Sequence, residues 1–267
     1  MTQDPSSSAN QRAIDIQGVR KAFGATAVLD HVDLSLATGE VLALLGPNGS
    51  GKTTLLKILA TLIRPSSGRG RVAGFDLLRE VEPIRQRVGF LAHGSYVYED
   101  LTAEENLRFW ATMAGLPADG GALRQALAAV ELEPVAGERA RTFSSGMKRR
   151  LALARTLLGA PRLLLLDEPF AGLDQQGKKW LEATLLAFRG KGGTVLLATH
   201  SFGRGLSIAD RVAILSGGRI VLDRPRASLD LEELHRLYAL FSEGGSAPLP
   251  MPPPGVFAGK AGARKER

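Results

Sequence analysis

The segment that most constrains this chain is a glycine-rich turn that joins an apolar strand to a helix. Val41–Leu45 is wholly apolar and has the length of a buried strand, and Thr53–Ile63 has the composition of a helix. Glycine leaves room for backbone N–H groups to surround an anion, and a helix N-terminus directs its dipole at the same point. The segment therefore predicts a strand–turn–helix unit that binds phosphate. Its residues are Gly46, Pro47, Asn48, Gly49, Ser50, Gly51, Lys52, Thr53 and Thr54.

Two side chains at the end of this turn indicate what kind of phosphate compound is bound. Lys52 can reach the β- and γ-phosphates of a nucleoside triphosphate, and the hydroxyl of Thr53 can coordinate Mg²⁺. The alternative is a glycine-rich turn that holds no ligand. Because a strand precedes the pattern and a helix follows it, we expect the triphosphate site.

Two carboxylates follow a second apolar strand. Leu163–Leu166 leads directly into Asp167 and Glu168, and side chains at the carboxyl ends of parallel strands face the ligand crevice. We expect Asp167 to hold Mg²⁺ through water, and Glu168 to act as the general base that polarises the attacking water. The alternative is that Glu168, which precedes Pro169, only opens a surface turn.

A histidine follows a third apolar strand, Thr194–Ala198. Its position just after the strand brings His200 to the same crevice, where a neutral imidazole could donate to the γ-phosphate and hold the attacking water. A lone histidine is more often structural or solvated, but the shared rim of strand ends favours the site. The catalytic candidates are thus Lys52, Glu168 and His200.

The composition excludes several classes of protein. With 44% hydrophobic and 23% charged residues, the 267-residue chain has a globular balance. No apolar run approaches the roughly 18–20 residues of a membrane-spanning helix, and the polar start of the chain argues against a secretory signal. The absence of cysteine excludes disulfides, thiolate metal sites and cysteine nucleophiles. The net charge of +7 leaves nucleic acid, an anionic membrane surface and a phosphorylated small molecule open as partners.

The chain divides into three parts. We expect residues 1–12 to be a flexible N-terminus, residues 13–242 to fold, and the basic residues 243–267, rich in proline and glycine, to be a disordered tail. Within the folded part, continuous apolar strands alternate with helices, which predicts an α/β fold with a largely parallel sheet. A helical stretch at about 94–158 interrupts this alternation as an inserted subdomain.

One more segment, Phe143-Ser144-Ser145-Gly146-Met147 before a basic helix, resembles the signature of the ABC (ATP-binding cassette) ATPases. The glycine-rich turn, Leu163–Pro169, Ala171–Asp174 and Thr199-His200 stand in that family's order and spacing, and the resemblance covers about residues 13–240. It implies a P-loop NTPase fold, namely an ABC nucleotide-binding domain with an antiparallel β subdomain and an inserted helical subdomain.

The resemblance also implies a homodimer that binds and hydrolyses ATP with Mg²⁺. Two such domains face each other head to tail, with ATP at their interface. Ser144 and Gly146 of one subunit would close on the γ-phosphate held by the other. Phe23 matches the aromatic residue that stacks on adenine, and Asp174 matches the loop that links the two sites.

His93 stands where most members of the family have a glutamine that contacts Mg²⁺ and water. It is therefore a candidate metal ligand, although Mg²⁺ prefers oxygen and a coupling role in its loop is the alternative. Together with Leu101–Phe109, the segment Gly89–Gly94 resembles the haem-exporter ATPases of cytochrome c maturation. This resemblance predicts the ATPase subunit of an exporter of haem; export of a drug, lipid or polysaccharide is the alternative.

Such an exporter needs separate membrane permease subunits, and residues 90–140 would receive their coupling helices. The expected location is cytoplasmic, peripheral on the inner face of the cell membrane, whose anionic surface suits the positive charge. A soluble ABC ATPase that acts on nucleic acid is less favoured, because the chain shows no second cassette, zinc module or long coiled coil. We therefore expect no nucleic acid partner.

Overall fold

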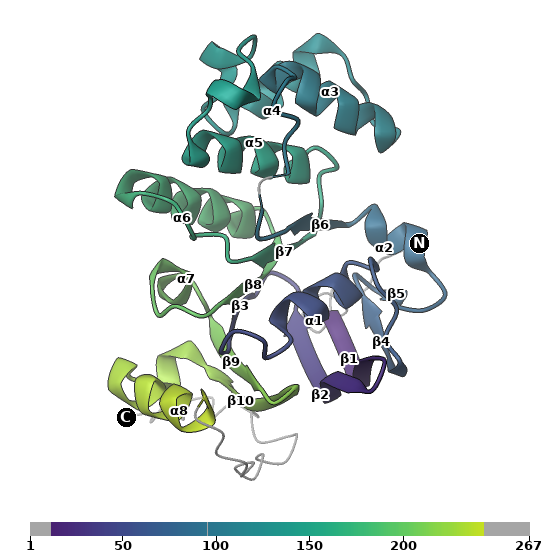
Figure 1. Cartoon of the computed structure of the whole chain (residues 1–267), viewed down its shortest axis with the longest axis vertical. Helices are drawn as coiled ribbons and strands as arrows, with labels where there is room; N and C mark the ends of the chain where they lie inside the picture. Colours follow the sequence, from purple (N-terminus) through teal and green to yellow (C-terminus); the bar gives the residue numbers. More distant parts are fainter. Residues whose placement is uncertain (1–11, 95, 243–267) are drawn as a thin grey trace, which may run out of the picture.

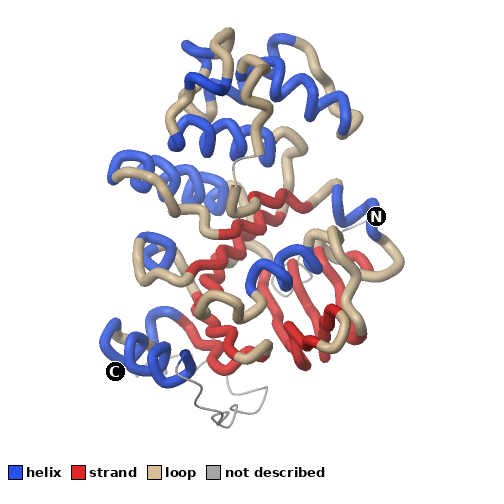
Figure 2. Tube along the Cα trace, viewed as in Figure 1, coloured by secondary structure: helices blue, strands red, loops and turns tan. Residues whose placement is uncertain are grey.

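The computed structural model describes residues 12–94 and 96–242, which form two β-sheets and a separate group of helices (Figures 1 and 2). The expected disordered tail, and all but the last residue of the expected flexible N-terminus, lie outside the described residues. The strands are β1 (Arg12–Phe23), β2 (Thr26–Ala37), β3 (Val41–Leu45), β4 (Ser67–Val72), β5 (Phe75–Asp76), β6 (Val88–Leu91), β7 (Leu163–Asp167), β8 (Thr194–Thr199), β9 (Arg211–Ser216) and β10 (Arg219–Pro225). The helices are α1 (Lys52–Leu59), α2 (Val81–Arg85), α3 (Ala103–Met113), α4 (Gly120–Ala128), α5 (Ser145–Leu157), α6 (Gln175–Gly190), α7 (Arg204–Ser207) and α8 (Leu231–Ser242).

The larger sheet has six strands in the order β10-β9-β3-β8-β7-β6. Strands β9, β3, β8, β7 and β6 are parallel, and β10 is antiparallel to β9. All residues of β3, β7 and β8 are buried. These strands are covered on both faces, which is why they consist of continuous apolar runs rather than alternating ones.

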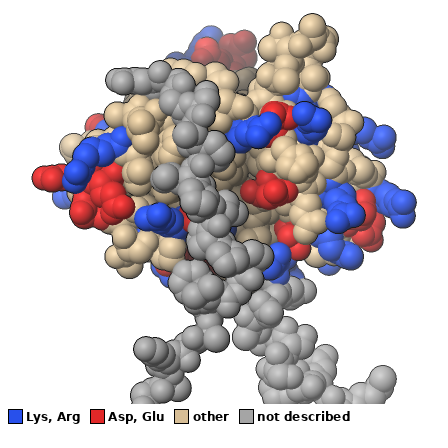
Figure 3. Space-filling model, turned by 90° about the horizontal axis from the view of Figure 1, so that it is seen from below, with Lys and Arg blue, Asp and Glu red and all other residues tan. Residues whose placement is uncertain are grey.

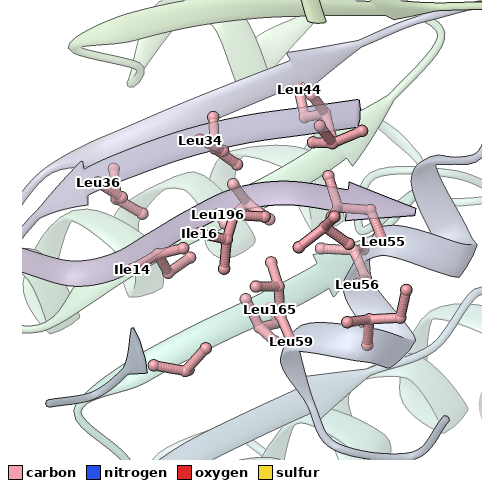
Figure 4. Close-up of a cluster of buried hydrophobic side chains, with 14 of the residues drawn as sticks. Ile14, Ile16, Leu34, Leu36, Leu44, Leu55, Leu56, Leu59, Leu165 and Leu196 are labelled. Atoms are coloured by element: carbon pink, nitrogen blue, oxygen red, sulfur yellow. The ribbon is translucent and has the colours of Figure 1, made fainter. Parts of the chain in front are cut away.

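Alternate residues of β3 enter two different hydrophobic clusters. Leu42 and Leu44 pack with α1 and with the smaller sheet, as Figure 4 shows for Leu44, Leu55 and Ile16. Val41, Ala43 and Leu45 face the opposite way, into a cluster with side chains of α5, α6 and α8. Successive side chains of a strand point to opposite faces of the sheet, so β3 is packed on both faces. This packing fixes the position of the turn that follows β3.

The smaller sheet is antiparallel, in the order β2-β1-β4-β5. It lies beside α1 in Figure 1, on the side of the larger sheet away from α6. Strand β4 was not foreseen, because its sequence Ser-Gly-Arg-Gly-Arg-Val has only one apolar residue and most of its side chains are at least partly exposed. The expected α/β architecture, with this antiparallel sheet, is confirmed.

Helices α3, α4 and α5 form a group at the top of Figure 1 with a core of its own. Leu107, Leu127 and Leu151, one from each helix, belong to this buried cluster. Helix α3 begins with a capping box, in which Thr102 Oγ1 accepts from Glu105 N at 3.1 Å and Glu105 Oε2 accepts from Thr102 N at 2.8 Å. In the described ranges 12–94 and 96–242, no helix has the length and apolarity that a membrane span requires.

Candidate active site

A cavity of about 670 Å³ lies at the carboxyl ends of three neighbouring strands. Strand β3 ends in the glycine-rich turn, β7 ends at Asp167, and β8 ends one residue before His200. Because these strands are adjacent and parallel, their ends meet at one edge of the sheet. The lining residues are Val28, Asn48, Gly49, Gly51, Lys52, Thr53, Thr54, His93, Asp167, Glu168 and His200.

The glycine-rich turn adopts a backbone that other residues rarely take. Gly49 has a φ of 81° and Gly51 a φ of 104°. A Cβ at Gly49 would meet nothing within 4 Å, whereas a Cβ at Gly46 would lie 2.3 Å from the carbonyl oxygen of Leu215. The turn is therefore packed tightly against β9 at its start and open at Gly49, which lines the cavity, a shape that suits a phosphate.

Lys52 is 7% exposed and folds back over the turn. Its Nζ donates to the carbonyl oxygens of Gly46 at 2.7 Å and Pro47 at 3.0 Å. Burial lowers the pKa of Lys52, and the charges of Glu168 and Asp167 oppose that shift. Ser50 is also buried, and its hydroxyl has no hydrogen-bond partner within the described part of the chain. Ser50 does not line the cavity, so it is the cation of Lys52, which does, that fits an anionic ligand.

Thr53 and Asp167 bring two oxygen ligands together. Thr53 Oγ1 donates to Asp167 Oδ2 at 2.7 Å, and Asp167 is only 2% exposed. Hydroxyl and carboxylate oxygens are the donors that Mg²⁺ prefers. Among residues 12–94 and 96–242, no group of three or more His, Asp or Glu side chains could hold a metal by itself. The donor set therefore fits Mg²⁺ that takes its other ligands from phosphate and water.

The carboxylate of Glu168 is held by the last residue of β8 and by the residue that follows it. Its Oε1 accepts from the backbone N–H of His200 at 2.9 Å and lies 2.7 Å from His200 Nδ1, and its Oε2 accepts from Thr199 Oγ1 at 2.9 Å. Glu168 has a φ of 48°, which is rare for a residue with a side chain. Contacts to both oxygens and this backbone turn together fix the direction of the carboxylate.

The contact with Glu168 also determines which nitrogen of His200 carries a proton. An ionised carboxylate only accepts, so Nδ1–H is the donor at 2.7 Å. In the neutral ring Nε2 is then an acceptor, able to hold a water molecule. Donation from Nε2 to a phosphate, as expected from the sequence, requires the doubly protonated ring.

His93 reaches the same cavity from the loop after β6. Its side chain is exposed, and its carbonyl oxygen accepts from Arg149 Nη1 at 3.1 Å. The structure thus brings His93 together with Lys52, Asp167 and Glu168, although these residues are far apart in the sequence.

Within the glycine-rich turn, Gly46, Pro47 and Ser50 do not line the cavity of this chain, and four predicted site residues from other segments do not line it either. Phe23 lies at the end of β1 and is 52% exposed. Ser144 is the N-cap of α5 and Gly146 lies in its first turn, while Asp174 is the N-cap of α6, where its Oδ1 accepts from Gly177 N at 2.7 Å. Ser144 and Gly146 are expected to act on the nucleotide of a partner subunit rather than on that of their own chain.

Three residues of the site were missed from the sequence, of which Val28 of β2 lines the cavity. Thr199 donates to Glu168, and Arg149 contacts the backbone of both Asp167 and Glu168. The place of Thr199 directly before His200 was a usable signal. No sequence signal marks Arg149, because it stands in a basic run that a solvent-exposed helix would also show.

The chain is similar in sequence to proteins of one known family. The sequence profile described as ABC transporter matches residues 29–171. The daunorubicin resistance ATP-binding protein DrrA3 of Streptomyces coeruleorubidus is 36% identical over 82% of this chain and 70% of its own length. The Nod factor export ATP-binding protein I of Bradyrhizobium diazoefficiens is 36% identical over 82% of this chain and 72% of its own length.

The fold is also that of solved ATP-binding subunits. A dimeric ATP-binding cassette in a post-hydrolysis state with ADP and Pi bound superposes with a TM-score of 0.73 at 26% identity, covering 80% of this chain and 98% of that one. The ATP-binding subunit of an ABC transporter superposes with a TM-score of 0.72 at 29% identity, covering 86% of this chain and 94% of that one. The chain belongs to the ABC transporter family and is an ABC-type ATPase.

Proposed function

We propose that this chain is the ATP-hydrolysing subunit of an exporter whose membrane-spanning subunits are separate chains. The observation that carries the role in ATP hydrolysis is the pair of Glu168 and His200 in one cavity with Lys52 and the Thr53–Asp167 oxygens, and the export role is proposed from the names of the relatives. These groups combine phosphate binding, a metal site and a base, which are the parts that phosphoryl transfer to water requires.

The chain's own residues divide the reaction between them. The turn and Lys52 hold the phosphates, and Thr53 and Asp167 hold Mg²⁺, which neutralises phosphate charge when it is bound. Glu168 takes a proton from the attacking water at its carboxylate. His200 and Thr199 keep that carboxylate in place, with His200 Nε2 free to orient the same water.

Substitution of Glu168 by glutamine tests the assignment. The amide keeps the shape and can still contact His200, but it cannot accept a proton, so we expect hydrolysis to fall by roughly 10²–10⁴ while ATP affinity stays near that of the unchanged protein. Glu232→Gln on the exposed side of α8 is the control. Hydrolysis at the normal rate by Glu168→Gln would remove Glu168 from the role of base.

We also propose that two copies close on ATP. In support, the structural relative with ADP and Pi is dimeric, and Ser144 accepts from Met147 N at the exposed start of α5. Ser144 and Gly146 would contact the partner's nucleotide, Phe23 would stack on adenine, and Asp174 would lie at the contact between the two sites. Glu168→Gln should therefore run at twice the mass of one chain in ATP during size-exclusion chromatography with light scattering, and at the mass of one chain without nucleotide.

The membrane subunits would dock in an apolar hollow of about 780 Å³ beside the helical group. Tyr98 and Trp110, which line it, have ring centroids 6.2 Å apart, and the lining residue Tyr96 is 66% exposed. Large exposed apolar groups gathered at one place are typical of a protein–protein contact. This docking would hold the chain at the cytoplasmic face of the membrane.

For the cargo, we propose a drug-like or lipid-like organic molecule in preference to haem. The relatives include proteins named for daunorubicin and linearmycin resistance and for Nod factor export. The haem assignment rests on short segments, Gly89–Gly94 with Leu101–Phe109 and the residues Phe143 and Gly146–Lys148, and it gains no support from these relatives. A spermidine/putrescine import protein is also 36% identical but is covered only over 59% of its length. Stimulation of the ATPase by candidate cargo, with the permease present, distinguishes these classes.

Nucleic acid is not favoured as a partner. On the face seen in Figure 3, lysine and arginine side chains lie among aspartate and glutamate side chains rather than in a basic stripe. Independently of that view, Arg211 pairs with both Asp223 and Glu40. Interspersed charges of both signs do not track a phosphate backbone.

A further inference from the structure

We infer that Arg149 is a positioning residue that ties the loop of His93 to the backbone of Asp167 and Glu168. The inference rests on the proposed ATPase function, because it concerns how the residues of that site are aligned. Arg149 lies in α5, the helix that begins just after Ser144. Its side chain does not line the cavity, so it acts through the backbone that it holds.

The two arms of the guanidinium hold different segments. Nη1 donates to the carbonyl oxygens of Ala92 at 2.8 Å and His93 at 3.1 Å. Nη2 donates to the carbonyl oxygens of Asp167 at 3.1 Å and Glu168 at 3.0 Å. A planar fork of fixed shape therefore spans both segments, which a single ammonium group cannot reproduce.

These four carbonyl oxygens lie where the strand ladder stops. Strands β6 and β7 are paired as far as Leu91 and Leu166. Beyond that pair, the chain leaves β6 toward His93 and leaves β7 toward Glu168, so the carbonyl groups between the two segments need other donors. Arg149 donates to all four carbonyl oxygens, of which Glu168 O also accepts from Ala171 N at 3.1 Å, and so continues the connection between the strands by one further step.

The environment of Arg149 is unusual for a structural arginine. It is only 6% exposed, and the hydrogen bonds of its guanidinium go to carbonyl oxygens rather than to carboxylates. Burial lowers the pKa of Arg149, and the nearby charges of Asp167 and Glu168 oppose that shift. A buried cation without a carboxylate contact is costly to fold around. Methionine would fill a similar space at a lower cost in folding free energy. The guanidinium of Arg149 therefore has a role beyond filling space.

The position of Arg149 in α5 couples movement of this helix to the residues of the site. Helix α5 carries Ser144 and Gly146 at one end and Arg149 one turn further along. A shift of this helix when a partner's nucleotide binds at Ser144 would move His93 and the Asp167–Glu168 peptide together. Arg149 thereby aligns Glu168 in step with closure of the dimer.

The test compares Arg149→Lys and Arg149→Gln with Arg150→Gln in the full chain. Arg150 is the matched control, because it lies in the same helix but pairs with Glu131 and stacks on Trp180 at 4.6 Å. For both Arg149 variants we expect kcat to fall about tenfold or more and the KM for ATP to change by less than about threefold. Amide hydrogen exchange without nucleotide should accelerate in residues 89–94 and 165–170, and Arg150→Gln should change neither kcat nor this exchange.

Each outcome bears on the inference. A normal kcat in Arg149→Gln, even with a lowered melting temperature, would reduce Arg149 to a packing role and overturn it. If Arg149→Gln does not fold, Arg149→Lys decides in the same way, since it keeps the charge and loses the fork. A protein with native Arg149 that hydrolyses no ATP would instead contradict the proposed function, and accelerated exchange at both segments in the variants would still support the connection.

Discussion

Individual glycines in the nucleotide turn differ in why they are needed. Gly46 is required by contact, since any Cβ there meets the Leu215 carbonyl. Gly49 is required by its φ of 81° and by the space for a ligand in the cavity that it lines. Gly192, between α6 and β8, has a similar φ of 85° and equally open surroundings. This pair allows backbone strain to be separated from ligand binding.

Gly49→Ala and Gly192→Ala should therefore lose similar stability, about 1–2 kcal/mol each, because both force alanine into the left-handed region. Only Gly49→Ala should weaken ATP binding, on the order of tenfold, because its methyl group enters the cavity beside the turn. Thermal unfolding and equilibrium nucleotide binding measure the two effects. Equal ATP affinity in both variants would contradict a phosphate cradle at Gly49.

The residues of the site also differ in how far the sequence predicts them. Lys52 and Thr53 follow from spacing alone, because turn and helix are continuous in the chain. The contacts of Glu168 with Thr199 and His200 depend on β7 and β8 being neighbours. Glu168 adopts its positive φ directly after the end of β7. Arg149 is identified only by the four carbonyl oxygens that surround it.

At the scale of elements, an exposed ion-pair network connects the two sheets. Asp30 of β2 accepts from Arg20 Nε of β1 at 2.8 Å and from Arg219 Nε of β10 at 3.0 Å. The Arg219 hydrogen bond, followed by that of Arg20, holds the pKa of Asp30 below its ordinary value of 3.8. The ionised carboxylate therefore stabilises the contact between the smaller sheet and the edge of the larger one.

The sign of this pKa shift predicts a pH dependence. Because the folded pKa is lowered, the stabilisation is present above pH 3.8 and is lost as the pH falls below it. Asp30→Asn should melt below the unchanged protein at pH 7, and the gap should narrow as the pH falls from about 5 to about 3. Asp100→Asn, at a carboxylate that is 87% exposed, is the control and should show little gap at either pH. A gap that stays constant with pH would rule out the ion pairs as its cause.

Some elements could be predicted from the sequence and others could not. Strands β3, β7 and β8 are evident as continuous apolar runs because both of their faces are covered. Strand β4 is not evident, since Val72 is its only apolar residue and most of its other side chains are at least partly exposed. Helix α1 ends at Leu59, short of the Ile63 expected, and Thr61 just beyond it has a φ of 59°.

At the scale of the whole molecule, the apolar hollow makes the proposal of separate membrane subunits testable. Leu62 and Tyr96 line it and are 55% and 66% exposed. A glutamate at either position leaves the core untouched but places a charge where an apolar partner would pack. Leu62→Glu and Tyr96→Glu should therefore reduce association with membranes that contain the permease, on the order of tenfold.

Leu186→Glu on α6 provides the matched control, because Leu186 is 43% exposed and lies outside the hollow. Sedimentation of the chain with vesicles that carry the permease measures the association. If all three variants bind as well as the unchanged chain does, the hollow is not the docking surface.

The sequence by itself determined the family, the nucleotide turn and the identity of the acidic pair and histidine, because each depends on a local pattern or on the order of patterns along the chain. Only the tertiary structure decided which of these groups touch. The parallel order β3-β8-β7 brings Thr53 to Asp167 and Glu168 to His200. The burial of Arg149 among carbonyl oxygens depends on α5 packing beside the end of β6. Such contacts join residues that are distant in the chain, and only the packing of sheet and helices fixes their distances.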